Sequence, residues 1–167
     1  MINQSRLKQL LNYDPNTGIF TWKIKGRKKI VGCINFKTGY LVIRIDNKLY
    51  QAHRLVFLYM TGDIPEYVDH IDCNKLNNKW SNLRKATKSQ NEMNKPKKIT
   101  NKTGFKGVVF VKARSHLKTP WKAQITCNRK QIALGYFETA ELAANAYNKA
   151  ALNLFQEYAN LNKGVLS

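Results

Sequence analysis

Alternating apolar and polar positions predict several short β-strands in the first third of the chain. Residues 19–25 place β-branched or aromatic side chains on alternate positions, which is the period of a strand with one buried face. Residues 40–45 and 48–52 are also rich in apolar and aromatic side chains, and they flank Asp46-Asn47. Asp and Asn tolerate the positive φ angles of a tight turn, so these two segments are expected to form an antiparallel hairpin.

Helical spacing predicts three helices. Leucines recur at helical positions in residues 5–11, behind Ser5 as a candidate cap, and residues 53–60 are apolar nearly all round, as in a short buried helix. The third helix begins at Thr139, a residue type common at helix N-caps. Its apolar stripe is expected to pack on a sheet and contains Leu142, Ala143, Ala146, Tyr147, Ala150, Ala151 and Leu154.

The middle of the chain predicts a β-loop-β-α unit. Residues 67–87 contain two strand-like segments separated by a long Asn-rich loop, and a short helix follows until Pro96 stops it. Residues 97–103 are basic, polar and without periodicity, so we expect a linker and a domain boundary there. Beyond the linker, three strands are expected at residues 105–111, 121–127 and 131–137.

These elements together predict an α+β protein. The expected fold is an N-terminal antiparallel sheet leading into the compact β-loop-β-α unit, followed by a three-stranded antiparallel sheet packed on one helix. The expected domains are residues 1–96, with a catalytic unit at about 53–96 that contains the β-loop-β-α segment, and residues 104–162. A chain of 167 residues is long enough for one ordinary domain or two small ones.

The charge of the chain points to a polyanionic partner. There are 29 Lys and Arg residues against 10 Asp and Glu, a formal net charge of +19. Basic residues are spread from Lys8 to Lys163 rather than gathered in one tail, so the whole molecule is expected to follow a phosphate backbone. A ribosomal-type structural protein or a cationic membrane binder would also account for the charge alone.

Cysteine usage and missing motifs argue against several classes of protein. Cys33, Cys73 and Cys127 are odd in number and widely separated, so neither a disulfide framework nor a zinc knuckle is indicated. No apolar run has the length of a membrane span and the N-terminus lacks the layout of a signal peptide, so the cytoplasm is the expected location. The absence of GxGxxG, P-loop and GxSxG motifs gives nucleotide-cofactor and serine-hydrolase functions no support.

The candidate chemistry centres on Asp69 and His70, at the end of a predicted strand. At a strand end both side chains can reach one cleft, where a carboxylate can hold a hard cation and an imidazole can transfer a proton. His53 can belong to the same site or be hydrogen-bonded in the packing between two elements. Two uses are also open for the polar residues of the following loop, contact with the water shell of a metal or hydrogen bonding within the loop. These residues are Asp72, Asn77 and Asn78.

The spacing of several short motifs resembles that of the HNH homing endonucleases of phages. These motifs are Val-Asp-His-Ile-Asp at residues 68–72, Asn77-Asn78, Ser-Asn-Leu-Arg at residues 81–84 and Ser-Gln-Asn at residues 89–91. The preceding segments are also similar to such enzymes, with a Tyr-Asp-Pro-x-Thr-Gly turn, a Trp-bearing strand, Gly39-Tyr40 and Ala-His-Arg-Leu at residues 52–55. The resemblance covers roughly residues 5–96 and implies a ββα-metal nuclease unit.

Residues 104–160 look like the AP2 DNA-binding domain, a module that commonly follows this kind of nuclease. The motifs are Gly-Phe-Lys-Gly-Val at residues 104–108, Trp-Lys-Ala-Gln-Ile at residues 121–125 and Leu-Gly-Tyr-Phe at residues 134–137 before an Ala-rich helix. This resemblance implies an AP2-like sheet that lies in the major groove. AP2 sheets usually carry several arginines, whereas this one is lysine-rich, which favours phosphate contacts over base readout.

The nuclease resemblance implies a role for four residues. His70 is expected to be the general base that takes a proton from the attacking water, and Asn82 to tie the loop together and orient that base. Asp69 and Asn91 are expected to hold one divalent cation, Mg²⁺ (or Mn²⁺). The third motif position is Asn91 rather than histidine, which disfavours a soft zinc-type site.

The expected function is metal-dependent hydrolysis of double-stranded DNA by a site-specific homing-type endonuclease. The alternative is a sequence-specific DNA-binding regulator without nuclease activity, and a structural RNA-binding protein would explain the charge alone. No protein partner or membrane partner is evident. The sequence leaves open which DNA sequence is the target, whether one strand or both are cleaved, and whether the protein is a monomer or a dimer. If the chain is phage-encoded, the expected location is the host cytoplasm. The candidate DNA contacts are Arg27, Lys28, Lys29, Lys106, Lys112, Arg114, Trp121, Lys122 and Arg129.

Overall fold

The computed structural model describes residues 2–24, 27–97 and 100–165, and the side chains of residues 24, 27 and 28 lie outside the description. Contacts divide the chain into two compact units, Met1–Asn91 and Glu92–Ser167. This division falls before the linker predicted at residues 97–103. Each unit has a hydrophobic core of its own.

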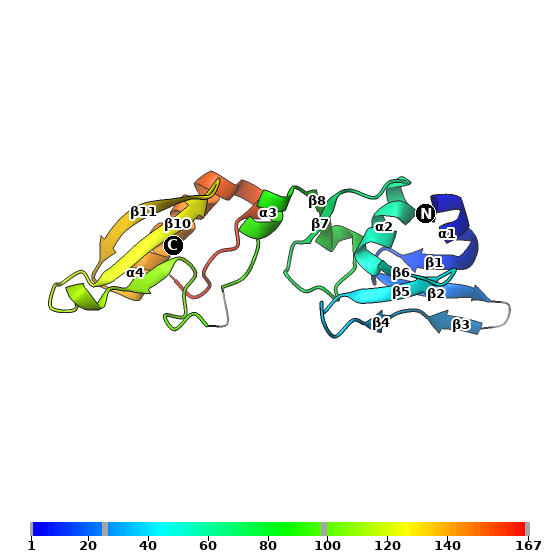
Figure 1. Ribbon diagram of the computed structural model, residues 1–167, viewed down its shortest axis with the longest axis horizontal. Helices are drawn as coiled ribbons and strands as arrows, with labels where there is room; N and C mark the ends of the chain where they lie inside the picture. The colour runs from blue at the N-terminus through cyan, green and yellow to red at the C-terminus, as the bar shows by residue number, and fades with distance from the viewer. Residues whose placement is uncertain (1, 25–26, 98–99, 166–167) are drawn as a thin grey trace. The chain divides into compact units, whose positions relative to one another are not determined.

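The first unit begins with helix α1 (Gln4–Leu10) and two small antiparallel sheets (Figure 1). The first sheet has the order β1-β2-β3 and consists of β1 (Leu11–Asp14), β2 (Ile19–Ile24) and β3 (Arg27–Ile30). The second has the order β4-β5-β6 and consists of β4 (Cys33–Ile34), β5 (Leu41–Ile45) and β6 (Lys48–Gln51). Helix α2 (Ala52–Thr61) follows and ends at Gly62, whose φ of 83° makes a left-handed C-cap.

Several local predictions for this unit can be compared with the structure. The predicted hairpin is confirmed, since Asp46 and Asn47 have φ angles of 44° and 64° between β5 and β6. The predicted Ser5 cap is wrong, because the Asn3 side chain accepts the hydrogen bond from the Arg6 N–H. Strands β1 and β3 are not among the strands predicted from the sequence, and both segments become strands by pairing with β2.

One core joins the helices and sheets of the first unit. Leu7, Leu11 and Phe20 come from α1, β1 and β2, and they meet Ile43 from β5. Helix α2 buries most of one face in the same core, as its nearly all-apolar sequence predicts. The core also takes in Val68 and Leu83, so it anchors both strands that carry the candidate chemistry.

The β-loop-β-α unit has the predicted order of elements. Strand β7 (Tyr67–His70) pairs antiparallel with β8 (Leu83–Ala86), and the loop between them ends in the 3₁₀ turn η1 (Trp80–Asn82). The short helix α3 (Lys88–Met93) follows β8. In the register of the hairpin, Asp69 lies opposite Arg84 and His70 lies opposite Leu83. The two candidate residues are therefore held at the end of a strand, next to the long loop.

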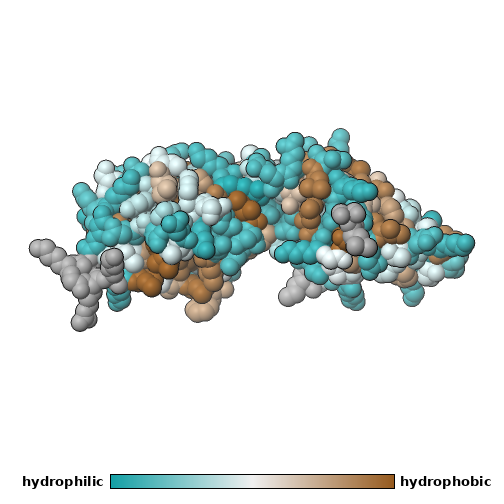
Figure 2. Space-filling view, turned by 180° about the vertical axis from the view of Figure 1, so that it is seen from behind, coloured by the Kyte–Doolittle hydropathy of each residue, from teal (hydrophilic) through white to brown (hydrophobic). Residues whose placement is uncertain are grey.

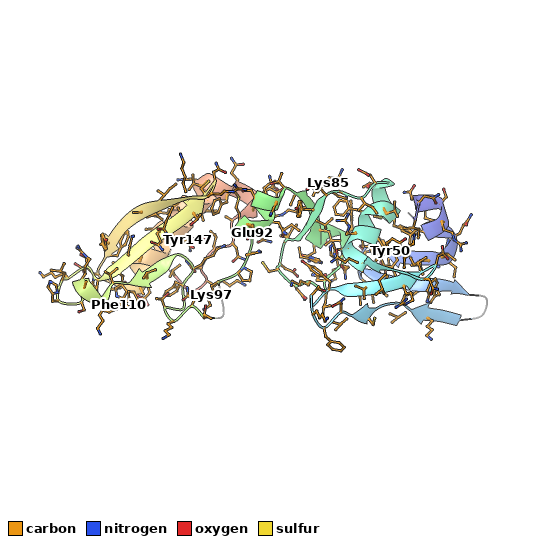
Figure 3. All side chains as sticks on the ribbon, in the orientation of Figure 1. Tyr50, Lys85, Glu92, Lys97, Phe110 and Tyr147 are labelled. Carbon is orange, nitrogen blue, oxygen red and sulfur yellow. The ribbon has the colours of Figure 1, made fainter. Side chains whose placement is uncertain are left out.

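The second unit is a three-stranded antiparallel sheet with a helix packed on it. The sheet has the order β11-β10-β9, from β9 (Val108–Phe110), β10 (Trp121–Cys127) and β11 (Lys130–Phe137). The remaining elements are the 3₁₀ turn η2 (Lys112–Arg114), helix α4 (Ala140–Phe155) and the 3₁₀ turn η3 (Gln156–Tyr158). Helix α4 is capped by the Thr139 side chain, as predicted, and Tyr147 (labelled in Figure 3) projects from it into the core.

The apolar stripe predicted for α4 is partly wrong. Leu142 and Leu154 are largely exposed, whereas Ala144 and Phe155 are buried against the sheet. The buried face follows positions 140, 143, 144, 147, 151 and 155, which is the spacing of one side of a helix. The sequence offers apolar residues on two sides of α4, and only packing on β9, β10 and β11 decides between them.

The structure confirms a mixed α and β protein built from small antiparallel sheets. The identification of the second unit with the AP2 domain stays a prediction. Hydrophilic residues cover much of the face seen in Figure 2. Within residues 2–24, 27–97 and 100–165, no helix has the length and apolar character needed to cross a membrane. The three cysteines are free thiols.

Candidate active site

Asp69 and Arg84 form a buried ion pair across the β7–β8 hairpin. Arg84 Nε lies 2.9 Å and Nη2 lies 2.7 Å from Asp69 Oδ2. The two side chains are only 5% and 13% exposed, so the pair is shielded from water on most sides. Directly opposite residues of antiparallel strands bring their side chains together, which explains the contact. The positive charge of Arg84 thus balances the Asp69 carboxylate at this end of the strand. Lys85, the next residue of β8, is exposed (Figure 3).

His70 is buried beside Asp69, and its ring is held on several sides. Nε2 of His70 lies 3.4 Å from Asn78 Oδ1. The ring centroids of His53 and Tyr40 lie 5.1 Å and 5.9 Å from that of His70. Burial lowers the pKa of His70 below its ordinary value, although the hydrogen bond with Asn78 acts in the opposite direction. The imidazole is therefore neutral near pH 7 and able to accept a proton.

His53 lies directly behind His70 rather than in unrelated packing. It begins the first turn of α2, and its ring also packs on Tyr40 at 4.7 Å between centroids. Its Nδ1 is buried and has no hydrogen-bond partner among the described residues. Burial, and then the nearby charges of His70 and Arg54, lowers the pKa of His53 to about 3. The sequence leaves two uses of His53 open, and the structure combines a packing position with contact to the candidate base.

The depressed pKa of His53 predicts acid sensitivity. The unfolded chain binds a proton at this residue below about pH 6.5, whereas the folded chain resists it until about pH 3. The free energy of unfolding is therefore unaffected by this residue above pH 6.5. It decreases as the pH falls toward 3, by up to about 1.4 kcal/mol per pH unit, because the unfolded chain binds the proton more readily. His53→Phe is expected to flatten the decline in the free energy of unfolding, measured in urea between pH 7.5 and 5. The exposed His116→Phe is the control, and an equal flattening there would contradict the assignment.

The loop after His70 is closed by the Asn82 amide. Asn82 Nδ2 donates to Asp72 Oδ1 at 2.8 Å and to the Asn77 carbonyl at 2.8 Å, while its Oδ1 accepts from the Asp72 N–H at 3.0 Å. Asn77 Nδ2 donates to the other carboxylate oxygen of Asp72 at 2.7 Å. Burial acts to raise the pKa of Asp72, but these hydrogen bonds and that from the Asn74 N–H outweigh it, so the pKa is lowered. Asp72 and Asn77 thus make hydrogen bonds within the loop, which is one of the two uses that the sequence left open for them.

Asn78, one of the three loop residues whose use the sequence leaves open, is the residue that reaches the His70 ring. The family resemblance predicts that Asn82 orients the base, but the direct contact comes from Asn78, which is itself almost fully buried. Asn78 also donates through Nδ2 to the Leu76 carbonyl at 3.2 Å, which holds its amide in one orientation. In an Asn-rich loop, no local signal separates Asn78 from its neighbours.

Strand β1 and the turn that follows it contact the backbone of this loop. Tyr13 Oη donates to the Asn78 carbonyl at 2.8 Å, and the Trp80 N–H donates to the Pro15 carbonyl at 3.0 Å. Gly18 has a φ of 75°, and a Cβ added to it would lie 2.5 Å from the backbone of Asn78 and Lys79. The Tyr-Asp-Pro-x-Thr-Gly turn is therefore part of the site, because it fixes the backbone of the residue that contacts His70.

Gly18→Ala is expected to damage both stability and any activity of the site. The added Cβ must push the Asn78 backbone away, and the positive φ costs about 1–2 kcal/mol in addition. Gly104→Ala is a matched control, since Gly104 has a φ of 80° and a Cβ added there would meet nothing within 4 Å. Thermal unfolding and cleavage assays of the two variants compare them. Equal losses in both variants would show that the contact with Asn78 is unimportant.

Asn91, the second predicted cation ligand, lies in α3. Its side chain is half-buried, and its N–H donates to the Thr87 carbonyl at 3.0 Å within the first turn of the helix. The described residues contain no group of three or more His, Cys, Asp or Glu side chains placed to share a metal.

The predicted DNA contacts lie in different settings. Lys29 is exposed on β3, whereas the side chains of Arg27 and Lys28 lie outside the described residues. In the second unit, Lys112 is exposed in η2 and Arg129 is exposed in the turn between β10 and β11, while Lys122 is half-buried on β10.

Three other predicted contacts have structural partners. Lys106 Nζ donates to the Met93 and Lys95 carbonyls at 2.8 and 2.6 Å. The Arg114 guanidinium lies 4.2 Å from the centroid of the Tyr136 ring. Trp121 packs on Phe110 with 4.9 Å between centroids and on the core beneath α4. These contacts account for the residue types without a nucleic acid.

Comparison with known proteins adds an independent finding. Residues 50–93 match the family model described as HNH endonuclease, and this segment runs from β6 to α3. A protein of Acanthamoeba polyphaga mimivirus described as an uncharacterised HNH endonuclease is 43% identical over 130 residues, covering 76% of this chain and 64% of the relative. Protein 3.8 of Escherichia phage T7 is 35% identical over 83 residues, covering 48% of this chain and 65% of the relative.

These matches cover parts of the proteins concerned. The chain spans slightly less than two thirds of the length of both relatives. No solved structure matches the chain. The predicted HNH resemblance is nevertheless confirmed for the segment with the candidate site, because the matched residues 50–93 include Asp69, His70 and Asn82. Residues 50–93 therefore carry an HNH endonuclease domain.

Proposed function

We propose that the chain is a metal-dependent endonuclease that hydrolyses phosphodiester bonds of double-stranded DNA. The observation that carries the proposal is the neutral, buried His70, held by Asn78 at the end of β7 within the segment that matches HNH endonucleases. A net charge of +19 supports a DNA substrate.

In this proposal His70 is the general base. When Nε2 carries the ring proton, it donates to Asn78 Oδ1, and Nδ1 is then the basic nitrogen of the neutral ring. A neutral imidazole can take the proton of the attacking water. The deprotonated water oxygen then attacks phosphorus as the bond to the leaving oxygen breaks. Asn78 fixes the tautomer, and Asn82 fixes the loop that carries Asn78. The proposal thus gives Asn78 the role of orienting the base, which the resemblance assigned to Asn82.

Asp69 and Asn91 would hold the divalent cation. Carboxylate and amide oxygens suit a hard cation such as Mg²⁺ or Mn²⁺, which keeps several waters and binds phosphate oxygens. Since Arg84 already balances the Asp69 charge, much of the charge of a bound cation would be met by the DNA phosphate. When bound, a divalent cation polarises the phosphate and stabilises the leaving oxygen.

The second unit is proposed to bind DNA through the outer face of its sheet. Ala123 and Ile125 of β10 face the core, so the alternate positions Lys122, Gln124 and Thr126 face away from α4. Lysine suits a phosphate, whereas glutamine and threonine can hydrogen-bond to base edges in the major groove. Trp121 is on the core side, so it supports the sheet in this arrangement. A homing-type, site-specific activity would depend on such contacts.

A supercoiled plasmid tests the proposal. Incubation with the full chain and Mg²⁺ is expected to yield open-circular or linear DNA, and excess EDTA to prevent it. A DNA-binding regulator would bind the plasmid in both conditions and leave it supercoiled. That result, with binding confirmed by gel shift, would favour the regulator.

A further inference from the structure

The turn between β4 and β5 presents an aromatic ring to solvent. Phe36 is 97% exposed, while the next most exposed large hydrophobic residue in the described part of the chain, Ile30, is 68% exposed. An isolated, partly exposed apolar side chain is ordinary on a protein surface. A phenylalanine ring with almost no intramolecular contact is a different case, because its whole surface is available to another molecule.

The turn holds Phe36 in a defined position. Asn35 Oδ1 accepts hydrogen bonds from the N–H groups of Lys37 and Thr38 at 3.1 and 3.2 Å. The Asn35 carbonyl accepts from the Gly39 N–H at 2.7 Å, and the Asn35 N–H donates to the Tyr40 carbonyl at 2.9 Å. These bonds close the turn on both sides of Phe36. The exposed ring therefore sits on a fixed support at the tip of a hairpin.

This support is connected to the candidate active site. Lys75, from the loop after His70, donates to the Thr38 carbonyl at 2.8 Å and lies 4.7 Å from the centroid of the Tyr40 ring. Tyr40 in turn packs on His70. Phe36 is four residues from Tyr40, so its Cα lies within about 14 Å of that of Tyr40 even if the chain is extended. At about 3.4 Å per base pair, this is a span of about four base-pair steps.

Positive charge accompanies the ring. Lys37 follows Phe36 directly and is exposed, and Lys75 contributes an ammonium group on the side of the catalytic loop. An exposed apolar side chain on a hydrogen-bonded turn, next to lysines, matches the apolar wedges with which DNA-binding proteins separate stacked base pairs and kink the duplex. A hydrophobic protein partner would instead require a wider apolar surface than a single ring between cations.

We propose that Phe36 inserts between adjacent base pairs of duplex DNA within a few steps of the phosphate that faces His70. The inference rests on the proposed function, since it assumes that DNA reaches this site. Insertion would unstack one step and bend the duplex, and the link through Tyr40 and Lys75 would place the bend next to the catalytic loop. Phe36 would thus be a positioning residue for DNA.

Plasmid unwinding tests this proposal without requiring cleavage. Closed-circular plasmid is bound by the full chain in EDTA, relaxed by a topoisomerase that needs no metal, and freed of protein. An inserted wedge unwinds DNA, so wild type is expected to leave negative supercoils in proportion to the protein bound. Phe36→Ala at equal occupancy is expected to reduce this shift at least threefold, whereas Phe36→Trp retains it. Leu49→Ala, at another exposed apolar position on β6, is expected to match wild type.

Cleavage of the same plasmid in Mg²⁺ separates the two claims. Phe36→Ala is expected to cleave at least tenfold more slowly than wild type at saturating protein. Unwinding by Phe36→Ala equal to that by wild type, or binding by wild type without unwinding, would overturn the wedge and leave the nuclease intact. Unwinding that depends on Phe36 without any cleavage would keep the wedge and refute the nuclease. Failure to bind the plasmid at all would refute both.

Discussion

Replacing His70 with alanine is expected to slow DNA cleavage by about 10²–10⁴-fold while leaving DNA binding nearly unchanged. The ring is the group proposed to take the proton from the attacking water, and the two other histidines of the chain are His53 and His116. His53 is not expected to take over as general base, because its ring packs against that of His70 and its pKa is lowered to about 3. The proposed DNA contacts come from lysines, from Phe36 and from the outer face of the second sheet, and this substitution replaces none of them.

Single-turnover cleavage at saturating protein measures the effect on chemistry alone. His116→Ala is the matched control, since it removes an exposed histidine from the second unit. Thermal unfolding of both variants checks that the loss of the buried His70 ring has not unfolded the site. Cleavage by a folded His70→Ala variant within about threefold of wild type would rule out His70 as the general base.

Arg84→Ala is expected to lower the free energy of unfolding by about 3–5 kcal/mol. The substitution removes the guanidinium whose Nε donates a hydrogen bond to Asp69 Oδ2 and whose Nη2 forms the ion pair, so the buried carboxylate loses the positive charge that balances it. The pair lies at the end of β7 next to His70, so cleavage is expected to fall as well. The effect follows from breaking the pair, and does not measure how much the intact pair stabilises the fold.

The exposed pair of Arg6 and Asp46 provides the comparison for Arg84. Arg6 Nη2 lies 3.1 Å from Asp46 Oδ1, but the two side chains are 47% and 57% exposed. Solvent screens such a pair, so Arg6→Ala is expected to lower the free energy of unfolding far less than Arg84→Ala does. Urea unfolding of the two variants tests the difference. Similar losses in both would show that Asp69 is not as strongly shielded as the structure indicates.

Much of the fold is predictable from the sequence where a local signal coincides with the final packing. The Asp46-Asn47 turn, the Thr139 cap and the order of β7, loop, β8 and α3 are all of this kind. The predictions fail where a distant partner decides the outcome. Strand β1 depends on pairing with β2, and the buried face of α4 depends on which of two apolar sides meets the sheet.

The candidate site follows the same rule. Asp69, His70 and Asn82 are recognisable because their spacing along the chain is specific to a known family. The motifs that contain Asn78, Tyr40 and Gly18 are recognisable too, but their roles are not, because each acts on the site through contacts that join separate segments. The sequence could indicate that a loop of asparagines is hydrogen-bonded. It could not indicate which asparagine contacts the base.

The most direct test of His70-dependent, metal-dependent cleavage is to add metal to a preformed complex. Wild type and His70→Ala are bound to plasmid in EDTA to equal occupancy, and excess Mg²⁺ is then added. We predict that supercoiled DNA is converted to open-circular or linear form in the wild-type complex, and at least about a hundredfold more slowly in the variant. The proposed mechanism would be contradicted if the plasmid in the wild-type complex stayed supercoiled in Mg²⁺ and in Mn²⁺. It would also be contradicted if the variant cleaved at the wild-type rate.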